Sequence, residues 1–243
     1  VVRIAVWNKP KLKEPRERDN SNLTSDLLQL LSNFNIASKE WIIRQYDHEV
    51  QGGSGLKPLQ GVGSGPGDAC ITRPILNSKK GIIISCGINP DFGKIDPYWM
   101  AAGVIDEALR QIVAVGGDIN KAAILDNFCW GNTNKPDRLG ALVRASQACY
   151  AIAKAYGVPF ISGKDSFNNE YSTGKKTISI PPTLLISCIA VMDDITKAIS
   201  MDAKHAGDGI YLVGVTKDEL GGSQYYKMKG FVGNGVPKVD ALY

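Results

Sequence analysis

The chain has 243 residues, and its 28 basic and 24 acidic side chains give a formal net charge of +4. This charge is too small to indicate nucleic acid or an anionic membrane as a partner, and no apolar run is long enough to cross a bilayer. None of the five cysteines forms a C-x-x-C pair, which is typical of reduced, mostly buried thiols. We therefore expect a soluble protein of the cytoplasm, with one large domain and a fraction of a second.

The N-terminal part is predicted to be a connector followed by two helices. A short strand over residues 1–6 leads into a charged, proline-containing stretch, residues 9–20, which can bury almost no apolar surface. We therefore expect residues 1–22 to be a linker that follows a preceding half of a longer chain. Apolar side chains at helical spacing predict a helix over residues 24–34, and Ser38 is expected to cap a second, short helix.

Glycine dominates residues 51–68, a stretch that ends on Asp68 and leads into a predicted strand over residues 69–73. The backbone N–H groups of such a stretch can hold an anion, but the spacing fits no nucleotide-binding fingerprint, so a surface loop remains the alternative. A continuously apolar segment, residues 81–86, predicts the next strand.

The clearest helix signal begins at Asp96, a predicted N-cap before Pro97, and ends at the glycine pair at residues 116–117. Apolar side chains recur between these ends at three- and four-residue steps, which predicts an amphipathic helix. Asp106 and Arg110 are four residues apart on it and are expected to pair.

Glu107 and Gln111 are also four residues apart and share one strip of this helix, where a carboxylate and an amide can hold a hard cation. A buried strand over residues 122–125 then delivers Asp126 and Asn127 to its carboxyl end, where ligands of sheet proteins often gather. From these residues alone, a solvated helix face and a turn remain the alternative.

A second long helix, over residues 139–156 and stopped by Gly157, precedes a predicted strand over residues 158–162 and the segment Gly163–Ser166. This segment resembles the end of a P-loop, but Val158 stands where the first glycine is required, and no Ser or Thr directly follows the lysine. What remains is a strand-end loop with a cation, a carboxylate and a hydroxyl side by side. Such a loop suits a phosphate with magnesium, with a solvated turn as the alternative.

A long apolar strand over residues 184–192 and a short helix over residues 193–199 complete the predicted first domain, residues 23–203. A strand over residues 210–215 is expected to begin a second unit, residues 204–243. This unit is too short to form a core of its own, so we expect an incomplete domain.

Eight short motifs now stand in a definite order along the chain. They are Arg44–Gln51, Gly65–Ala69, Asp96–Tyr98, Asp106–Ala108, Leu125–Phe128, Gly163–Ser166, Ile180–Thr183 and Leu220–Ser223. In this order the chain resembles the phosphoribosylformylglycinamidine synthases, the ATP-dependent amidotransferases of purine biosynthesis, over residues 27–226.

The resemblance implies an α+β fold, in which a mixed sheet is packed with helices in an aminoimidazole-ribonucleotide-synthetase-like N-terminal domain, followed by the start of a C-terminal α+β domain. It implies the second of two homologous halves, whose sheet packs against the sheet of the first half with nucleotide near the seam. The expected partners are that first synthetase half, a glutaminase subunit or domain and the substrate formylglycinamide ribonucleotide. A homodimer through the exposed sheet stays open.

The resemblance also implies roles for single residues. These are Mg²⁺ ligands at Asp68, Glu107, Gln111 and Asp165, ATP or phosphate contacts at Asp126, Gly163 and Lys164, and a substrate contact at Ser166. Gln111 and Lys164 stand where asparagines are common. We therefore expect Gln111 to reach the ion through water and Lys164 to neutralise phosphate, because a protonated lysine cannot bind a metal. Asp68, Glu107, Asp126 and Asp165 are expected to converge on one pocket.

In the implied reaction, ATP phosphorylates the amide oxygen of formylglycinamide ribonucleotide, and ammonia from glutamine displaces the phosphate, while magnesium spreads the developing charge. The histidine-containing motif of the first half and a glutaminase triad are absent from the sequence, so the chain by itself is expected to be inactive. Two alternatives stay open. One is a structural half that holds a bound ADP, and the other is a sister kinase of the same superfamily, against which residues 180–183 and 220–223 argue.

Overall fold

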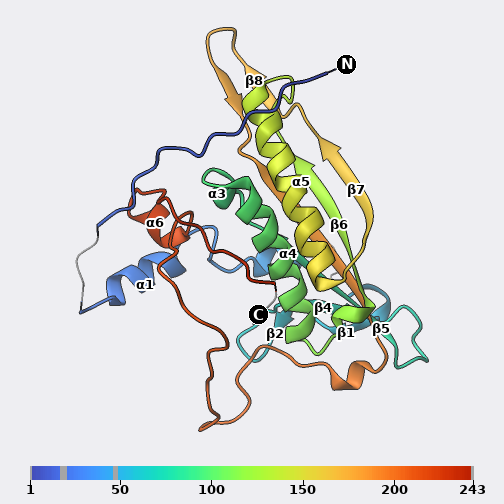
Figure 1. The fold of residues 1–243 in the computed structure, drawn as a ribbon. Coiled ribbons are helices and arrows are strands. Elements are labelled where there is room, and N and C mark those ends of the chain that lie inside the picture. The colour runs from blue at the N-terminus through green and yellow to red at the C-terminus, as the bar shows by residue number, and fades with distance from the viewer. Residues whose placement is uncertain (1, 17–20, 46–48, 242–243) are drawn as a thin grey trace.

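The computed structural model describes residues 2–16, 21–45 and 49–241 (Figure 1). The helices are α1 (Thr24–Leu31), α2 (Glu40–Ile43), α3 (Pro90–Gly93), α4 (Pro97–Ala114), α5 (Pro136–Tyr156) and α6 (Gln224–Met228), with short 3-10 turns at Val50–Gly52, Ile119–Lys121 and Ile195–Lys197. The strands are β1 (Ser54–Leu56), β2 (Leu59–Gln60), β3 (Gly65–Pro66), β4 (Cys70–Thr72), β5 (Gly81–Ile88), β6 (Ala122–Cys129), β7 (Phe160–Ser166), β8 (Glu170–Ser172), β9 (Thr177–Ser179) and β10 (Thr183–Met192).

One six-stranded sheet organises the molecule, with the strand order β1-β4-β5-β10-β6-β7. Its neighbouring strands are antiparallel except for β6 and β7, which are parallel and are joined through α5. β2 with β3 and β8 with β9 form separate two-stranded sheets. The mixed sheet packed with helices confirms the predicted α+β class.

Helices α4 and α5 lie side by side and cover one face of the sheet (Figure 1), and the core lies between them and the strands. Both ends of α4 follow the prediction: the Asp96 carboxylate accepts the Tyr98 N–H at 2.9 Å, and Gly116 just beyond the helix has a φ of +91°. Gly157 ends α5 in the left-handed region as well. Ile105 and Ile124 are fully buried between these layers.

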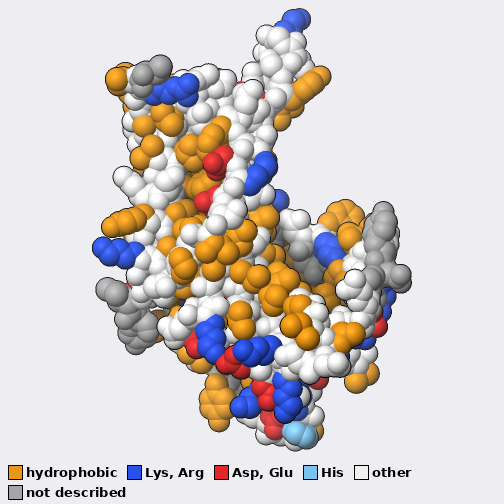
Figure 2. All heavy atoms as spheres, turned by 90° about the vertical axis from the view of Figure 1, so that its right-hand side faces the viewer, with side chains coloured by type: hydrophobic (Ala, Val, Ile, Leu, Met, Phe, Trp, Pro, Cys, Tyr) orange, Lys and Arg blue, Asp and Glu red, His pale blue; other side chains and the backbone are white. Residues whose placement is uncertain are grey.

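The opposite face of the sheet carries no helix among the described residues. Side chains alternate along β5, so that Ile83 is fully buried beneath α4 while Ile84 and Ile88 on the other face are 44% and 47% exposed. Val191 of β10 is 46% exposed on the same face. Figure 2, viewed from the side where β7 lies in Figure 1, shows hydrophobic side chains spread over this part of the surface. We call this surface the open face of the sheet.

The predicted N-terminal strand is wrong, because residues 2–6 form no strand, and this part of the predicted linker is not fully solvated. The Val6 N–H donates to the Pro136 carbonyl at 2.9 Å, and the Trp7 ring lies under the Arg144 guanidinium at 4.2 Å. Gly140 makes this contact possible, since a Cβ there would lie 2.3 Å from the Val6 backbone. The segment therefore docks on α5, a long-range contact that local sequence pattern does not encode.

The C-terminal part also differs from its prediction. Residues 210–215 form no strand, and Ile210, Leu212 and Val213 are 100%, 81% and 89% exposed, because no partner strand lies beside them among the described residues. The β8–β9 hairpin was not predicted, although Gly174, with a φ of +81°, marks its turn. The division at residue 203 remains a prediction.

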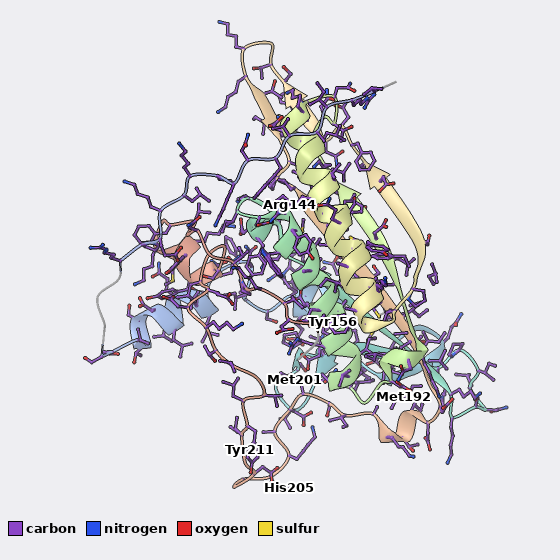
Figure 3. The ribbon with its side chains drawn as sticks, viewed as in Figure 1. Arg144, Tyr156, Met192, Met201, His205 and Tyr211 are labelled. Carbon is purple, nitrogen blue, oxygen red and sulfur yellow. The ribbon has the colours of Figure 1, made fainter. Side chains whose placement is uncertain are left out.

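Tyr156 ties the last turn of α5 to α4 (Figure 3). Its hydroxyl donates to the Asp106 carboxylate at 2.5 Å, and Arg110 donates to the other oxygen of that carboxylate, which confirms the predicted Asp106–Arg110 pair. Burial and the bond to Asp106 raise the pKa of Tyr156. Within the described chain, no helix is both long and apolar enough to cross a membrane.

We expect Tyr156→Phe to lower the free energy of unfolding by about 1.5–3 kcal/mol, because it removes one part-buried hydrogen bond to a charged group. Because the folded-state pKa is above the unfolded value, this contribution is complete below the unfolded pKa of tyrosine and is lost as the pH rises towards the folded one. Urea denaturation at neutral pH measures the change. Tyr150→Phe, whose residue is 69% exposed, is the control and should change little; equal losses in both variants would contradict the assignment.

Candidate nucleotide and metal site

Glu107 and Gln111 of α4 bind the edge of strand β5. The Glu107 carboxylate accepts the Ile88 N–H at 3.1 Å, and the Gln111 side-chain carbonyl accepts the Cys86 N–H at 3.2 Å. These two N–H groups lie beyond the end of the β4 ladder, which stops where Cys70 pairs with Ile84. The two side chains therefore satisfy backbone donors that a longer β4 would have bonded.

Asp68 lies two residues before Cys70, at the end of β4 nearest the part of the β5 edge that pairs with no strand among the described residues. We call this part the vacated edge of β5. Glu107 and Gln111 thus lie at the second half of β5, and Asp68 precedes β4, the strand whose ladder with β5 stops just before this half. The sequence correctly predicted that Glu107 and Gln111 lie on the same strip of α4. It did not predict the backbone N–H groups that they bind, because these depend on where β4 ends.

Gly87 allows α4 to approach β5 closely enough for these contacts. A Cβ at this position would lie 2.0 Å from the Val104 carbonyl oxygen and 3.1 Å from the Glu107 carboxylate. The Ser85 hydroxyl, on the same strand, donates to the Ala108 carbonyl at 2.7 Å. Close backbone packing of helix on strand therefore fixes where the Glu107 carboxylate lies.

The surroundings of Glu107 favour its neutral form. Burial raises the pKa of Glu107, the neighbouring Asp106 charge raises it further, and the Ile88 N–H opposes both effects without cancelling them. Burial and Glu107 likewise raise the pKa of the nearby Cys86 thiol. A cation bound beside Glu107 would relieve this unfavourable charge.

A second group of predicted residues lies on the parallel pair β6 and β7. Asp126 pairs in register with Gly163, and Phe128 pairs with Asp165. A Cβ on residue 163 would lie 2.4 Å from the Asp126 carboxylate, so glycine is required there. Burial and the Asp165 charge raise the pKa of Asp126, against the effect of the Lys164 backbone N–H.

Two predictions about this group are wrong. Asp126 and the segment Gly163–Ser166 lie inside strands β6 and β7, not at a strand end or in a loop. Because side chains alternate along a strand, Lys164 and Ser166 lie on the open face while Asp165 lies on the opposite face, beside Asp126. The Lys164 ammonium donates to the Ser166 hydroxyl. The Lys164 ammonium and the Ser166 hydroxyl therefore lie together, whereas the Asp165 carboxylate lies on the other face of the sheet.

The expected single pocket is also wrong for this chain. Strand β10 lies between β5 and β6, so Asp68 and Glu107 are separated from Asp126 and Asp165. Across the described residues, no group of three or more His, Cys, Asp or Glu side chains is placed to hold a metal ion. Strand order, which no local pattern reveals, is the reason for the error. The metal, nucleotide and substrate roles of the single residues remain predictions.

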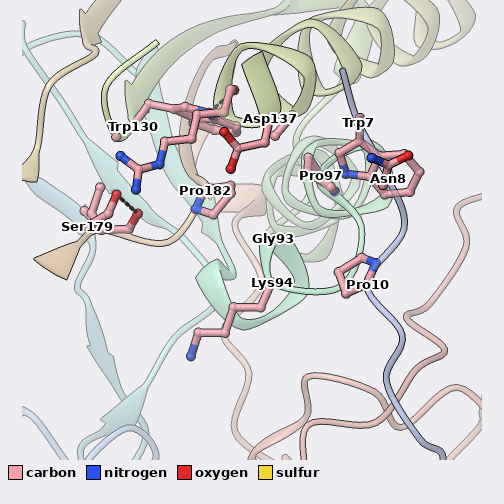
Figure 4. A pocket seen from close by; sticks show the side chains of 14 residues that line it. Trp7, Asn8, Pro10, Gly93, Lys94, Pro97, Trp130, Asp137, Ser179 and Pro182 are labelled. Carbon is pink, nitrogen blue, oxygen red and sulfur yellow. Dashed lines mark hydrogen bonds between the residues drawn. The ribbon is translucent and has the colours of Figure 1, made fainter. Parts of the chain in front are cut away.

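A well-defined hollow lies elsewhere, beneath the docked N-terminal segment (Figure 4). Its volume is about 340 Å³, and Trp7, Pro97, Trp130 and Pro182 line it. Arg138 also lines it and pairs with Glu170 at the base of the β8–β9 hairpin. None of the predicted site residues lines this hollow.

The middle of the motif at residues 44–51, Tyr46 to His48, lies outside the described residues.

The cysteines were expected to be reduced and mostly buried. All five cysteines are free, but only Cys149 and Cys188 are buried. Burial raises the pKa of both thiols, that of Cys149 to about 12 with help from Asp126, which makes them unreactive.

The chain forms an α+β domain with a mixed sheet, and one face of this sheet is left open. Acidic side chains lie on both sides of β10. These features together define the class of protein. The family model for the N-terminal domain of AIR synthase related proteins matches residues 66–192, just over half of the chain. The chain belongs to this family.

Curated relatives agree with the resemblance found in the sequence. The chain is 36% identical over 246 residues to the phosphoribosylformylglycinamidine synthase subunit PurL of Methanothrix thermoacetophila, a match that covers 96% of this chain and 30% of the relative. It is 34% identical over 236 residues to the same subunit of Methanocaldococcus jannaschii, again covering 96% and 30%. The chain therefore spans about 30% of the length of these relatives.

Solved structures of similar fold come from Thermotoga maritima. Its PurLQS structure matches with a TM-score of 0.55 and 23% identity, over 82% of this chain and 28% of that chain. T. maritima PurL complexed with ADP matches with a TM-score of 0.54 and 22% identity, over 80% and 28%. At such identities the matches show the fold, and they confirm the α+β prediction.

Proposed function

We propose that the chain is part of an ATP-dependent phosphoribosylformylglycinamidine synthase, which converts formylglycinamide ribonucleotide to formylglycinamidine ribonucleotide in purine biosynthesis. The observation that carries this proposal is 36% identity across 96% of the chain to a PurL subunit. T. maritima PurL, which shares the fold, has been obtained with ADP and with FGAR. The chain is the second synthetase half and works in the cytoplasm.

Asp68 and Glu107 would hold a magnesium ion at the vacated edge of β5. The donor set fits a hard cation, because both side chains offer carboxylate oxygens and the Ile88 N–H occupies only one oxygen of Glu107. Gln111 has its carbonyl oxygen on the Cys86 N–H, so it would act through water. Asp165 would hold a cation on the other side of β10, beside Asp126, whose pKa it raises.

Magnesium, when bound, would neutralise the charge that develops on the transferred phosphoryl group. The residues of β6 and β7 would position the reactants. Gly163 accommodates the Asp126 carboxylate, and both residues would contact ATP on the helix-covered side of the sheet. On the open face, Lys164 would neutralise phosphate with its ammonium and Ser166 would bind the substrate. The amide oxygen phosphorylated in this way becomes a leaving group that ammonia displaces.

The open face of the sheet supports the proposed partners. Ile84, Ile88 and Val191 expose apolar surface there, next to Lys164 and Ser166 on the same side. A first synthetase half would cover this surface and complete the site, and a glutaminase subunit or domain would deliver ammonia. A homodimer through the same face is the competing arrangement.

We expect Asp126→Ala combined with Ser166→Ala in the full-length synthase to lower turnover by at least about 100-fold, as the loss of preorganised contacts does in other enzymes. Steady-state product formation with saturating ATP and glutamine measures it. The control is Asp218→Ala with Ser25→Ala, which removes the same side chains at exposed positions and should leave turnover unchanged. Normal turnover in the Asp126→Ala, Ser166→Ala variant, with an unchanged unfolding midpoint, would show that Asp126 and Ser166 do not belong to the catalytic site.

The separation of the two groups of residues by β10 favours a second candidate function, in which the β5 edge holds a nucleotide that only supports the fold. Mass spectrometry of the full-length protein after denaturation distinguishes the candidates. Release of one ADP that survives Asp126→Ala but is lost with Glu107→Ala would favour the structural role. Absence of nucleotide in the purified, folded protein would favour the catalytic one.

A further inference from the structure

A polar hollow of about 530 Å³ lies where α3, α6 and the segment after α1 meet. We propose that it binds a phosphate ester of a small molecule, with the phosphate on Lys94 and Lys227 and the remainder on Ile88 and two prolines. No residue given a metal, nucleotide or substrate role above lines this hollow, although it shares Ile88 with the open face of the sheet.

The charge in the hollow is positive because two lysines share one carboxylate. Lys94 donates to one oxygen of Asp91 at 2.5 Å, and Lys227 donates to the other oxygen at 3.0 Å. The Asp91 side chain is only 12% exposed, whereas those of Lys94 and Lys227 are 45% and 50% exposed. The three groups therefore leave one net positive charge, and that charge faces the solvent-filled space.

The remaining hydrogen-bonding groups are mainly donors. Each lysine has three N–H donors and, among the described residues, gives one of them to Asp91. Asn89 already accepts the Phe92 N–H, and Gln224 accepts from the Asn35 amide, so their NH₂ groups remain. A phosphate group, which offers only acceptors when fully ionised, matches this inventory better than a cation or a neutral ligand does.

The wall of the hollow is apolar on one side. Ile88, 47% exposed, lies there with Pro90 and Pro181. A phosphate alone would leave this surface in contact with water, whereas a sugar or other carbon skeleton attached to the phosphate would cover it. The positive charge together with the apolar wall indicates a phosphate ester and not free inorganic phosphate.

Asp91 is ionised at neutral pH, so its charge offsets that of one of the two lysines. Burial raises the pKa of Asp91, but the hydrogen bonds and charges of Lys94 and Lys227 outweigh burial and lower it overall. Because the carboxylate has two partners, removal of one lysine leaves it paired with the other. Lys227→Met is therefore expected to fold, and Asp91→Asn keeps the shape of the side chain.

Isothermal titration of the full chain with ribose 5-phosphate, at constant ionic strength and pH 7.5, tests the proposal. We expect saturable binding that Lys227→Met weakens at least tenfold and Asp91→Asn strengthens several-fold, because one substitution removes a positive charge and the other removes a negative one. Lys176→Met, at the exposed β8–β9 turn, makes the same charge change elsewhere and should leave the affinity unchanged.

Inorganic phosphate is the second probe and should bind at least tenfold more weakly than ribose 5-phosphate. Equal affinity for the two probes would overturn the assignment of an ester. Absence of saturable binding to the wild-type chain, or equal weakening by Lys176→Met and Lys227→Met, would overturn the site itself. Circular dichroism of each variant confirms that a loss of binding is not a loss of fold.

Discussion

Arg144→Ala is expected to lower the free energy of unfolding by about 3–5 kcal/mol, because it leaves a buried carboxylate without its partner. Arg144 donates two hydrogen bonds to Asp96, at 2.8 and 2.7 Å, and the Asp96 side chain is only 9% exposed. The same carboxylate caps α4. The Trp7 ring also packs on the guanidinium, so the docked N-terminal segment loses one of its contacts as well and keeps the bond from Val6 to Pro136.

Guanidinium denaturation at neutral pH measures this loss. Arg110→Ala is the matched control, since Arg110 also pairs with an aspartate of α4 but its side chain is 72% exposed, so a change below about 1 kcal/mol is expected. The double variant Arg144→Met with Asp96→Asn should recover much of the stability, because asparagine still caps a helix and carries no charge. Equal losses in Arg144→Ala and Arg110→Ala would show that Asp96 is not held as described.

Gly87→Ala is expected to destabilise the fold by about 2–3 kcal/mol, through overpacking of a backbone that cannot yield. The new methyl group would lie 2.0 Å from the Val104 carbonyl oxygen, so α4 must move away from β5. Any such movement breaks the bond between the Glu107 carboxylate and the Ile88 N–H, whose length is now 3.1 Å. Stability and the proposed magnesium site should therefore be lost together.

Gly103→Ala is the control for this substitution, because it lies on the same helix. A Cβ at residue 103 would meet only the Phe92 ring, at 3.8 Å, which is ordinary contact. Alanine is the better helix former, so a gain of about 0.5–1 kcal/mol is expected. Thermal unfolding of both variants gives the comparison; a loss in Gly103→Ala as large as in Gly87→Ala would mean that α4 tolerates no change at all.

The two long helices could be predicted because their signals are local, whereas α3 was not predicted and the helix expected over residues 193–199 is only a 3-10 turn. Asp96 and Pro97 start α4, glycines end α4 and α5, and the apolar spacing between these ends needs no knowledge of the rest of the chain. The long strands β5, β6 and β10 were predicted for the same reason, although β6 and β5 extend further than their apolar runs.

For the candidate site, the sequence could name single residues but not their arrangement, and the roles of these residues remain predictions. The resemblance named Glu107, Gln111, Asp126 and Asp165, but nothing local says that β10, the last strand in the chain, lies between β5 and β6. The Gly163–Ser166 segment was expected to be a loop because glycine, lysine, aspartate and serine favour turns. Parallel pairing with β6 makes it a strand and sends alternate side chains to opposite faces.

Strand β7 is the last strand of its sheet, so one row of its backbone groups has no strand partner among the described residues. An unpaired strand edge is a template for the strand of another molecule, and proteins guard against such growth with charged side chains, lysine above all. Lys164 and Asp165 stand near the C-terminal end of this edge. We therefore expect Lys164 to protect against aggregation in addition to its proposed contact with phosphate, so that arginine or glutamine is a safer replacement for it than an apolar residue.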